Sequence, residues 1–232
     1  MGKLVLIGSQ KIDIGKSIIC IKAGVNLSQN SNKILLVDLS SGKKKMSEYL
    51  NVNEDIIYDI KDVFDGICSL NQAIIEINER LSLLPYPRIA EKLCDIQINK
   101  FSNLFNEAKK EYDLIFVDVD KLSHSYIDFS IVDSVVSVYS NDFSCIKEIN
   151  SDKAIACKYN VKSIHTILNK YNKKKAKNGT MMNSSDIQKL TEMNINTIIE
   201  ENIKYANADY EFLFSKEENS FNKAIKTLVN QL

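Results

Sequence analysis

The nine residues from Ser9 to Ser17 read S-Q-K-I-D-I-G-K-S. They follow an apolar run, Leu4–Ile7, and lead directly into a stretch with helical periodicity. A tight turn that ends Gly-Lys-Ser between a strand and a helix is typical of a phosphate-binding loop, because backbone N–H groups and the positive end of the helix face the anion. In such a loop Lys16 holds the β- and γ-phosphates, and the Ser17 hydroxyl can bind Mg²⁺. The alternative is an ordinary strand–helix turn in which Gly15 serves only the tight geometry.

Apolar runs alternate with helical patterns along the chain. Several runs are almost purely Ile, Leu and Val, which is typical of strands buried on both faces of a parallel sheet. We expect strands at Leu4–Ile7, Ile34–Val37, Leu81–Leu84, Leu114–Val117, Val135–Tyr139, Ile164–Leu168 and Ile195–Ile199. We expect helices at Ser17–Gln29, Ser69–Ile77, Asn99–Lys110, Phe143–Lys158, Ser184–Glu192 and Glu218–Gln231. Repeated strand–helix–strand units predict an α/β fold, a doubly wound, mostly parallel sheet with helices on both faces, in one domain over residues 1–232.

Two aspartates extend the predicted site beyond the loop. Asp38 and Asp118 each follow an apolar run, so both fall at the carboxyl ends of predicted strands, where open parallel sheets bind their ligands. A carboxylate at a strand end can instead cap the next helix, and for either aspartate alone that is a fair alternative. The presence of both beside a phosphate loop favours a nucleotide site.

Composition limits the classes of partner and compartment. Lys plus Arg and Asp plus Glu both number 30, so no net charge favours nucleic acid or an anionic membrane. The lysine-rich segment Lys170–Lys177 is expected to be a solvated loop, because only Tyr171 offers an aromatic ring beside its charges. The sequence shows neither a signal-peptide pattern nor a run of about 18 apolar residues, so we expect a cytoplasmic protein.

The cysteines are widely separated, at Cys20, Cys68, Cys94, Cys145 and Cys157. None of them forms a C-x-x-C pair, which argues against zinc, iron–sulfur or disulfide chemistry. An iron–sulfur reductase or metal carrier on this fold would need such pairs. We therefore expect buried, reduced thiols.

Taken together, the pattern resembles the MinD/ParA family of deviant Walker A ATPases, and MinD most closely within it, over nearly the whole chain. The family motif K-G-G-x-G-K-[ST] is matched at Lys11, Gly15, Lys16 and Ser17. The stretch I-Y-D-I-K-D-V-F-D-G-I-C-S-L-N-Q-A-I-I resembles the family segment between the second and third strands. The later stretches I-L-N-K-Y and N-G-T-M-M-N-S-S-D-I resemble the strand, loop and helix start on the adenine side.

The resemblance implies ATP or ADP with Mg²⁺ as the ligand and assigns roles to individual residues. Lys11 would be the signature lysine that reaches the partner's phosphates across a nucleotide-dependent homodimer, although it could also be a solvated loop lysine. Asp118 would hold the hydrated Mg²⁺ together with Ser17, Asp38 would be the first aspartate of a D-x-D switch, and Asn169 would read the adenine ring. The predicted catalytic residues are Lys11, Lys16 and Asp38; the nucleotide-binding residues are Gly15, Lys16, Ser17 and Asn169; and the metal ligands are Ser17 and Asp118.

The chain departs from the family at several positions that serve hydrolysis. The second switch aspartate, which orients the attacking water, is Ser40, and losing a general base typically slows a reaction by about 10²–10⁴. The two glycines after the signature lysine are Ile12 and Asp13, and Asp13 brings a negative charge toward the phosphates. The family's D-x-P/A-x-G switch reads D-V-D-K-L, without its glycine. These departures predict weak or absent hydrolysis.

We therefore expect a divergent MinD-like nucleotide-binding protein that positions or assembles a division, flagellar or pilus-type machine through a protein partner. One alternative is a slow, active ATPase that switches between monomer and dimer, and another is a pseudo-ATPase scaffold with an empty pocket. The last helical segment carries an apolar stripe that includes Phe221, Ile225 and Leu228. Family members place a membrane anchor beyond this position, so we interpret the stripe as core and predict no intrinsic membrane anchor.

Overall fold

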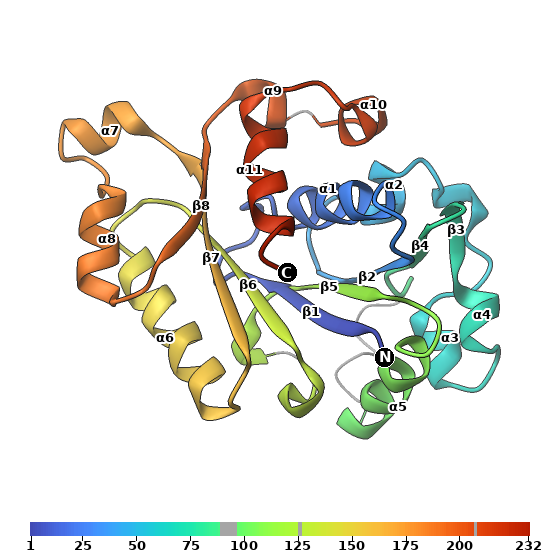
Figure 1. Cartoon of the computed structure of the whole chain (residues 1–232). Coiled ribbons are helices and arrows are strands. Elements are labelled where there is room, and N and C mark those ends of the chain that lie inside the picture. The colour runs from blue at the N-terminus through green and yellow to red at the C-terminus, as the bar shows by residue number, and fades with distance from the viewer. Residues whose placement is uncertain (89–96, 125–126, 207) are drawn as a thin grey trace.

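The chain folds around a large, mostly parallel sheet. The computed structural model describes residues 1–88, 97–124, 127–206 and 208–232. Within these residues eight strands form one sheet in the order β3–β4–β2–β5–β1–β6–β7–β8 (Figure 1). The strands are β1 (Lys3–Gly8), β2 (Ile34–Leu39), β3 (Ile75–Asn78), β4 (Leu81–Leu84), β5 (Leu114–Val119), β6 (Ser134–Tyr139), β7 (Ser163–Tyr171) and β8 (Ile195–Glu200). All neighbours are parallel except β3 and β4, which confirms the predicted α/β fold.

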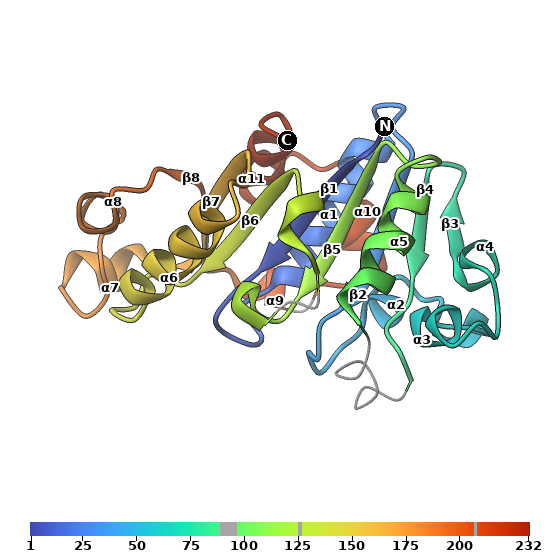
Figure 2. The same cartoon turned by 90° about the horizontal axis from the view of Figure 1, so that it is seen from below.

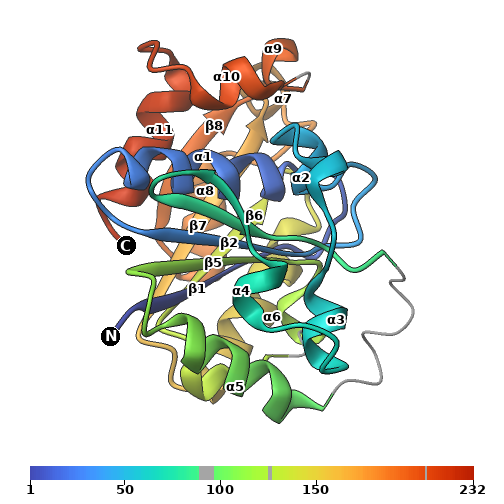
Figure 3. The same ribbon diagram turned by 90° about the vertical axis from the view of Figure 1, so that its right-hand side faces the viewer.

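Helices cover both faces of this sheet, as Figures 2 and 3 show. The described helices are α1 (Lys16–Ser28), α2 (Met46–Tyr49), α3 (Ile60–Phe64), α4 (Leu70–Ala73), α5 (Ile98–Ala108), α6 (Cys145–Lys158), α7 (Lys173–Lys177), α8 (Ser184–Thr191), α9 (Ile203–Ala206), α10 (Tyr210–Phe214) and α11 (Ser220–Val229). Helices α1, α10 and α11 share one hydrophobic cluster with the sheet, and α3, α4 and α5 share another. The sheet is therefore the middle layer of three.

The central strands owe their position to side chains that are apolar on both faces. In β1, Val5 and Ile7 belong to the cluster beneath α1, whereas Leu4 and Leu6 belong to the cluster on the opposite face. All four side chains are fully buried. A strand that is apolar at every position is stable only between two covered faces, so β1 lies in the middle of the sheet.

Two local predictions were wrong. The predicted helix at Ser69–Ile77 is the one-turn helix α4 followed by β3, because I-E-I-N alternates between half-buried and exposed positions and pairs with β4. The predicted loop Lys170–Lys177 is partly regular: β7 continues to Tyr171, and α7 follows. The side-chain oxygen of Asn172 caps α7 by accepting a hydrogen bond from the backbone N–H of Lys175 at 2.9 Å.

The predicted burial of the cysteines is correct in part. Cys20 and Cys145 are buried, Cys68 is half-buried and Cys157 is exposed. Cys157 lies near the carboxyl end of α6, which ends at Lys158. Cys94 lies outside the described residues.

The apolar stripe of α11 packs inside the protein. Phe221, Ile225 and Leu228 are almost completely buried in the cluster that also contains residues of α1 and β8. This agrees with the interpretation of the stripe as core. In the parts of the chain that the structure describes, no helix has both the length and the apolar character needed to cross a bilayer.

Candidate functional site

The loop after β1 meets α1 in a geometry that requires glycine. Gly15 is the N-cap of α1 and has a left-handed backbone with φ 91°. A Cβ atom at this position would lie 2.6 Å from Nδ2 of Asn169. Both the backbone conformation and the close approach therefore exclude larger side chains. This geometry presents the first N–H groups of α1, together with Lys16 and Ser17, at the carboxyl end of the sheet.

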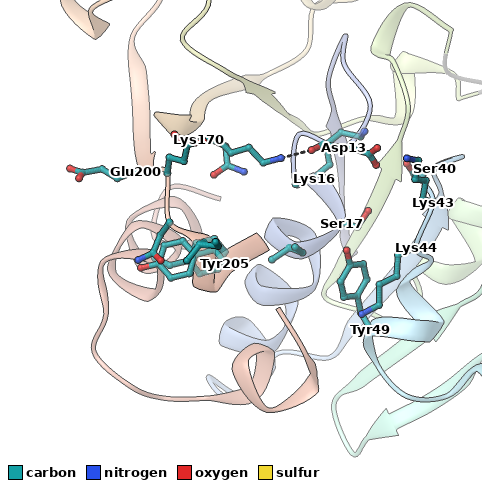
Figure 4. Close-up of a pocket in the computed structure, with 18 residues that line it drawn as sticks. Asp13, Lys16, Ser17, Ser40, Lys43, Lys44, Tyr49, Lys170, Glu200 and Tyr205 are labelled. Atoms are coloured by element: carbon teal, nitrogen blue, oxygen red, sulfur yellow. Dashed lines mark hydrogen bonds between the residues drawn. The ribbon is translucent and has the colours of Figure 1, made fainter. Parts of the chain in front are cut away.

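A cavity of about 580 Å³ opens in front of this loop. Asp13, Lys16 and Ser17 line its middle (Figure 4), and Gly15 also lines it. Lys43, Lys44 and Tyr49 lie on one side of them in the view, and Glu200 and Tyr205 lie on the other. The volume falls within the range of about 300–1,000 Å³ that is typical of small-ligand pockets. The cavity is therefore large enough for a nucleotide laid across the start of α1.

The burial and the hydrogen bonding of Asp118 are those expected of a metal-binding carboxylate. It is completely buried, and its Oδ2 accepts a hydrogen bond from the hydroxyl of Ser17. Its Oδ1 is buried without a hydrogen-bond partner, which is costly for a polar atom. Burial raises the pKa of Asp118 to about 7, against the opposing charge of Lys16. A hydroxyl beside an unpartnered carboxylate oxygen is a set of hard oxygen ligands, which fits a hydrated Mg²⁺.

Asp38 lies beside Asp118 in the sheet, but both of its carboxylate oxygens bind backbone N–H groups. The two residues are directly paired in the register of β2 and β5. Oδ1 of Asp38 accepts a hydrogen bond from the backbone N–H of Ser40 at 3.1 Å, and Oδ2 accepts one from Met46 at 2.8 Å. Burial raises its pKa to about 6. The structure thus places Asp38 behind the segment from Ser40 to Met46, where its carboxylate holds that segment in shape.

Lys11 is not directed into the cavity. Its ammonium forms an ion pair with Asp142, lies 3.5 Å from a carboxylate oxygen of Glu148 and 3.4 Å from the hydroxyl of Ser140. Ser140 and Asp142 lie between β6 and α6, and Glu148 lies in the first turn of α6. Lys11 therefore lies apart from Lys16 and Ser17 of its own chain, and its predicted contact with the phosphates of a partner chain stays a prediction.

Asn169 joins the wall of the cavity to the loop. Its Nδ2 donates a hydrogen bond to the carbonyl oxygen of Ile14 at 2.7 Å, and its side chain is almost completely buried. It follows the run that β7 contributes to the sheet core, so the carboxyl half of that strand brings it against Gly15. The predicted residues Gly15, Lys16, Ser17 and Asn169 line one cavity, and Asp118 lies directly behind it.

Of the residues that depart from the family motif, Ile12 and Asp13 are exposed, whereas Ser40 is buried. Ile12 is 69% exposed, so its side chain does not fill the cavity. Asp13 lines the cavity with a left-handed backbone, φ 55°, and its carbonyl accepts a hydrogen bond from Nζ of Lys170 at 2.6 Å. The hydroxyl of Ser40 donates to Oδ1 of Asp120 at 3.0 Å. The hydroxyl of Ser40 is thus hydrogen-bonded to the carboxylate of Asp120, and Ser40 itself has no carboxylate that could act as a base.

Sequence reasoning missed two walls of the cavity. Lys43, Lys44 and Tyr49 come from the segment after β2, and Tyr205 comes from the segment after β8. A signal was present for the first wall, because a run of three lysines begins six residues after Val37, the last residue of a predicted strand.

Comparisons with known proteins place this geometry among known ones. No protein-family model matches the chain. Septum site-determining protein MinD of Bacillus subtilis is 24% identical over 195 residues, which cover 81% of this chain and 72% of that protein. The solved MinC:MinD cell division protein complex of Aquifex aeolicus contains a chain that superposes with a TM-score of 0.85 at 24% identity, covering 99% of this chain and 95% of that one. MinD of Pyrococcus horikoshii OT3, solved in complex with Mg-ADP, superposes with a TM-score of 0.82 at 20% identity, covering 100% and 96%.

Proposed function

This chain belongs to the MinD/ParA family as a divergent member, about 24% identical to MinD of Bacillus subtilis, and on that premise we propose that it binds ATP or ADP together with Mg²⁺. The observation that carries the proposal is the unpartnered Oδ1 of Asp118, buried beside the Ser17 hydroxyl at a cavity of about 580 Å³. A buried carboxylate oxygen is costly to leave without a partner, and a hydrated cation would satisfy it.

Each residue of the site has a definite task in this proposal. The N–H groups at the start of α1 and the ammonium of Lys16 hold the phosphates, and Gly15 allows the backbone to approach them. Ser17 and Asp118 hold Mg²⁺, which when bound supplies positive charge to the phosphate oxygens. Asn169 lines the cavity from β7, which pairs with β8, and Tyr205 lines it from the segment after β8, so we place the base at this wall.

We propose that hydrolysis is weak or absent. The position of the water-orienting aspartate is Ser40, whose hydroxyl already donates to Asp120. A hydroxyl in that state is a poor base, and general bases contribute about 10²–10⁴ to rates. Asp38, the other predicted switch residue, uses both of its carboxylate oxygens to bind the backbone of its own loop.

The cellular role that we propose is a positioning or assembly regulator, in the cytoplasm, that acts on a protein partner and forms a nucleotide-dependent homodimer. Its relatives are septum site-determining proteins, and one solved relative is part of a MinC:MinD cell division protein complex. A division machine is therefore the first candidate for the partner, and flagellar or pilus-type machines are the next.

The proposal is tested by calorimetric titration of the full chain with ATP and with ADP, each in the presence of Mg²⁺. We expect both nucleotides to bind, and we expect Lys16→Ala to weaken both by about tenfold or more, because a hydrogen-bonded charge is lost. An unchanged unfolding midpoint of the variant shows that its fold is intact.

A second function, a scaffold with an empty pocket, is favoured by the carboxylate of Asp13 at the cavity wall. Like charges about 6 Å apart at an effective dielectric of about 20 repel by roughly 3 kcal/mol. Failure of the unmodified chain to bind either nucleotide would support the scaffold and contradict nucleotide binding.

A further inference from the structure

We propose that Lys43 and Lys44, the lysine pair, supply the positive charge for the terminal phosphate of a nucleoside triphosphate within the same chain, in place of Lys11. The inference rests on the proposed nucleotide binding. Through the lysine pair, this chain distinguishes a nucleoside triphosphate from a nucleoside diphosphate.

Neighbouring acids hold the ammonium of Lys11 outside the cavity of its own chain. Its ammonium is bound to Asp142, and Glu148 and Ser140 lie within 3.5 Å of it. Two acids at the start of α6 therefore compete with any phosphate for this charge. Lys11 does not contribute to the lining of the cavity.

The lysine pair lies at the cavity, where Lys11 does not. Both residues line the cavity, on the side of Ser17 that is opposite to Tyr205 (Figure 4). The ammonium of Lys44 lies 4.0 Å from the centre of the Tyr49 ring, which also lines the cavity. This cation–π contact holds the side chain of Lys44 at the rim without neutralising its charge.

Hydrogen bonds hold the segment that carries the lysine pair in place. Asp38 binds the backbone N–H groups of Ser40 and Met46, one on each side of the pair. The carboxylate of Asp120 accepts hydrogen bonds from the hydroxyl of Ser40 at 3.0 Å and from the N–H of Ser41 at 3.0 Å. Nζ of Lys45 donates to the carbonyl of Ser40 at 2.6 Å. The segment is thus fixed at both ends, so presenting the pair costs little ordering on binding.

The orientation of the bound nucleotide decides where its terminal phosphate lies. With the base toward Tyr205 and the first phosphates at Lys16 and Ser17, the terminal phosphate points toward Ser40 and the lysine pair. Negative charge is already dense there, because burial raises the pKa of Asp118 and the charges of Asp38 and Asp120 raise it further. A further phosphate needs additional cations, and the lysine pair is in place to provide them.

The test compares a non-hydrolysable ATP analogue, AMPPNP, with ADP in calorimetric titrations of the full chain with Mg²⁺. The unmodified chain is expected to prefer AMPPNP. The double variant Lys43→Gln, Lys44→Gln is expected to bind AMPPNP about tenfold more weakly and ADP within about twofold of the unmodified chain. A merely structural role would weaken both ligands together, so the ratio of the two affinities is the decisive readout.

Two matched variants complete the experiment. Lys33→Gln removes a lysine that lies 4.9 Å from the centre of the Tyr112 ring, just before β2 begins, and is expected to change neither affinity. Lys11→Gln is expected to leave the preference for AMPPNP intact at both low and high protein concentration. Loss of the preference in Lys11→Gln, or its persistence in the double variant, would overturn the inference. Absence of binding of both ligands to the unmodified chain would instead overturn the proposed function itself.

Discussion

The phosphate loop lines the middle of the cavity and the segment from Ser40 to Lys45 contributes to one side of it, yet the two retain different amounts of the family pattern. The loop keeps Gly15, Lys16 and Ser17 in a geometry that depends on glycine, with Asp118 behind them. The other segment has a hydroxyl where the family has an acid, and its backbone is tied to Asp38 and Asp120. The difference indicates that phosphate binding and turnover can be lost separately, because different walls of one cavity carry them.

The largest effect is expected from Gly15→Ala, which attacks the retained wall. The new Cβ would lie 2.6 Å from Nδ2 of Asn169, and the left-handed backbone would be strained as well. We expect the free energy of unfolding to fall by about 2–4 kcal/mol and nucleotide binding to be lost. Urea unfolding and calorimetric titration measure the two effects.

Gly179→Ala is the matched control. Gly179 also has a left-handed backbone, with φ 77°, but nothing lies within 4 Å of a Cβ built there. This variant should lose only about 1 kcal/mol of stability and should bind nucleotide normally. An equal loss of stability in both variants would show that the contact with Asn169 is unimportant.

An intermediate effect is expected from Asp118→Asn in the absence of nucleotide and Mg²⁺. Burial raises the pKa of Asp118 to about 7 in the folded state, so the folded protein binds a proton more readily than the unfolded chain does. The stability that this group contributes is therefore greatest below about pH 4 and is lost as the pH rises through about 7. Asp118→Asn should raise the free energy of unfolding by about 2 kcal/mol at pH 8 and change it little at pH 4.

Asp133→Asn should show the opposite sign. Partial burial alone would raise the pKa of Asp133, but hydrogen bonds from Lys109 at 2.8 Å and from the N–H of Leu4 at 3.0 Å lower it to about 2. Its contribution to stability is present above about pH 4 and is lost as the pH falls through about 2. The variant should therefore be less stable at pH 8. The same sign for both variants in urea unfolding at pH 8 would contradict the view that Asp118 is a carboxylate left without its cation.

The sequence allowed prediction wherever a local pattern decides the structure. The buried strands could be located because a run such as Leu4–Ile7 suits only a doubly covered position. Asp118 could be assigned to one end of the sheet because it follows a predicted strand, whereas Asn169 was assigned through the resemblance of I-L-N-K-Y to the family. Strand β3 could not be predicted, because its half-exposed I-E-I-N depends on pairing with β4. The run of lysines after β2 was visible in the sequence, but the position of the lysine pair at the cavity also depends on a hydrogen bond between Asp38 and the backbone of Met46, eight residues further along the chain.

The smallest effect is expected from Ser40→Asp, which restores the family residue to the altered wall. The new carboxylate would lie against Asp120, which now accepts the hydroxyl of Ser40 at 3.0 Å. Two like charges in contact repel, so the variant should bind Mg-nucleotide more weakly than the unmodified chain. Asp13 also remains at the cavity wall, where its charge opposes the phosphates. Phosphate release from ATP should therefore stay within about twofold of the low level expected for the unmodified chain, which is far below the 10²–10⁴ that a working base provides.

The double variant Ser40→Asp, Asp120→Asn separates repulsion from the remaining defects. It keeps a single carboxylate at this corner and an amide oxygen that can still accept the N–H of Ser41. Binding of Mg-nucleotide should return to the level of the unmodified chain, whereas phosphate release should stay low because Asp13 is unchanged at the cavity wall. Rapid turnover in either variant would show that the loss of one carboxylate accounts for the whole defect, and that the two walls of the cavity have not diverged independently.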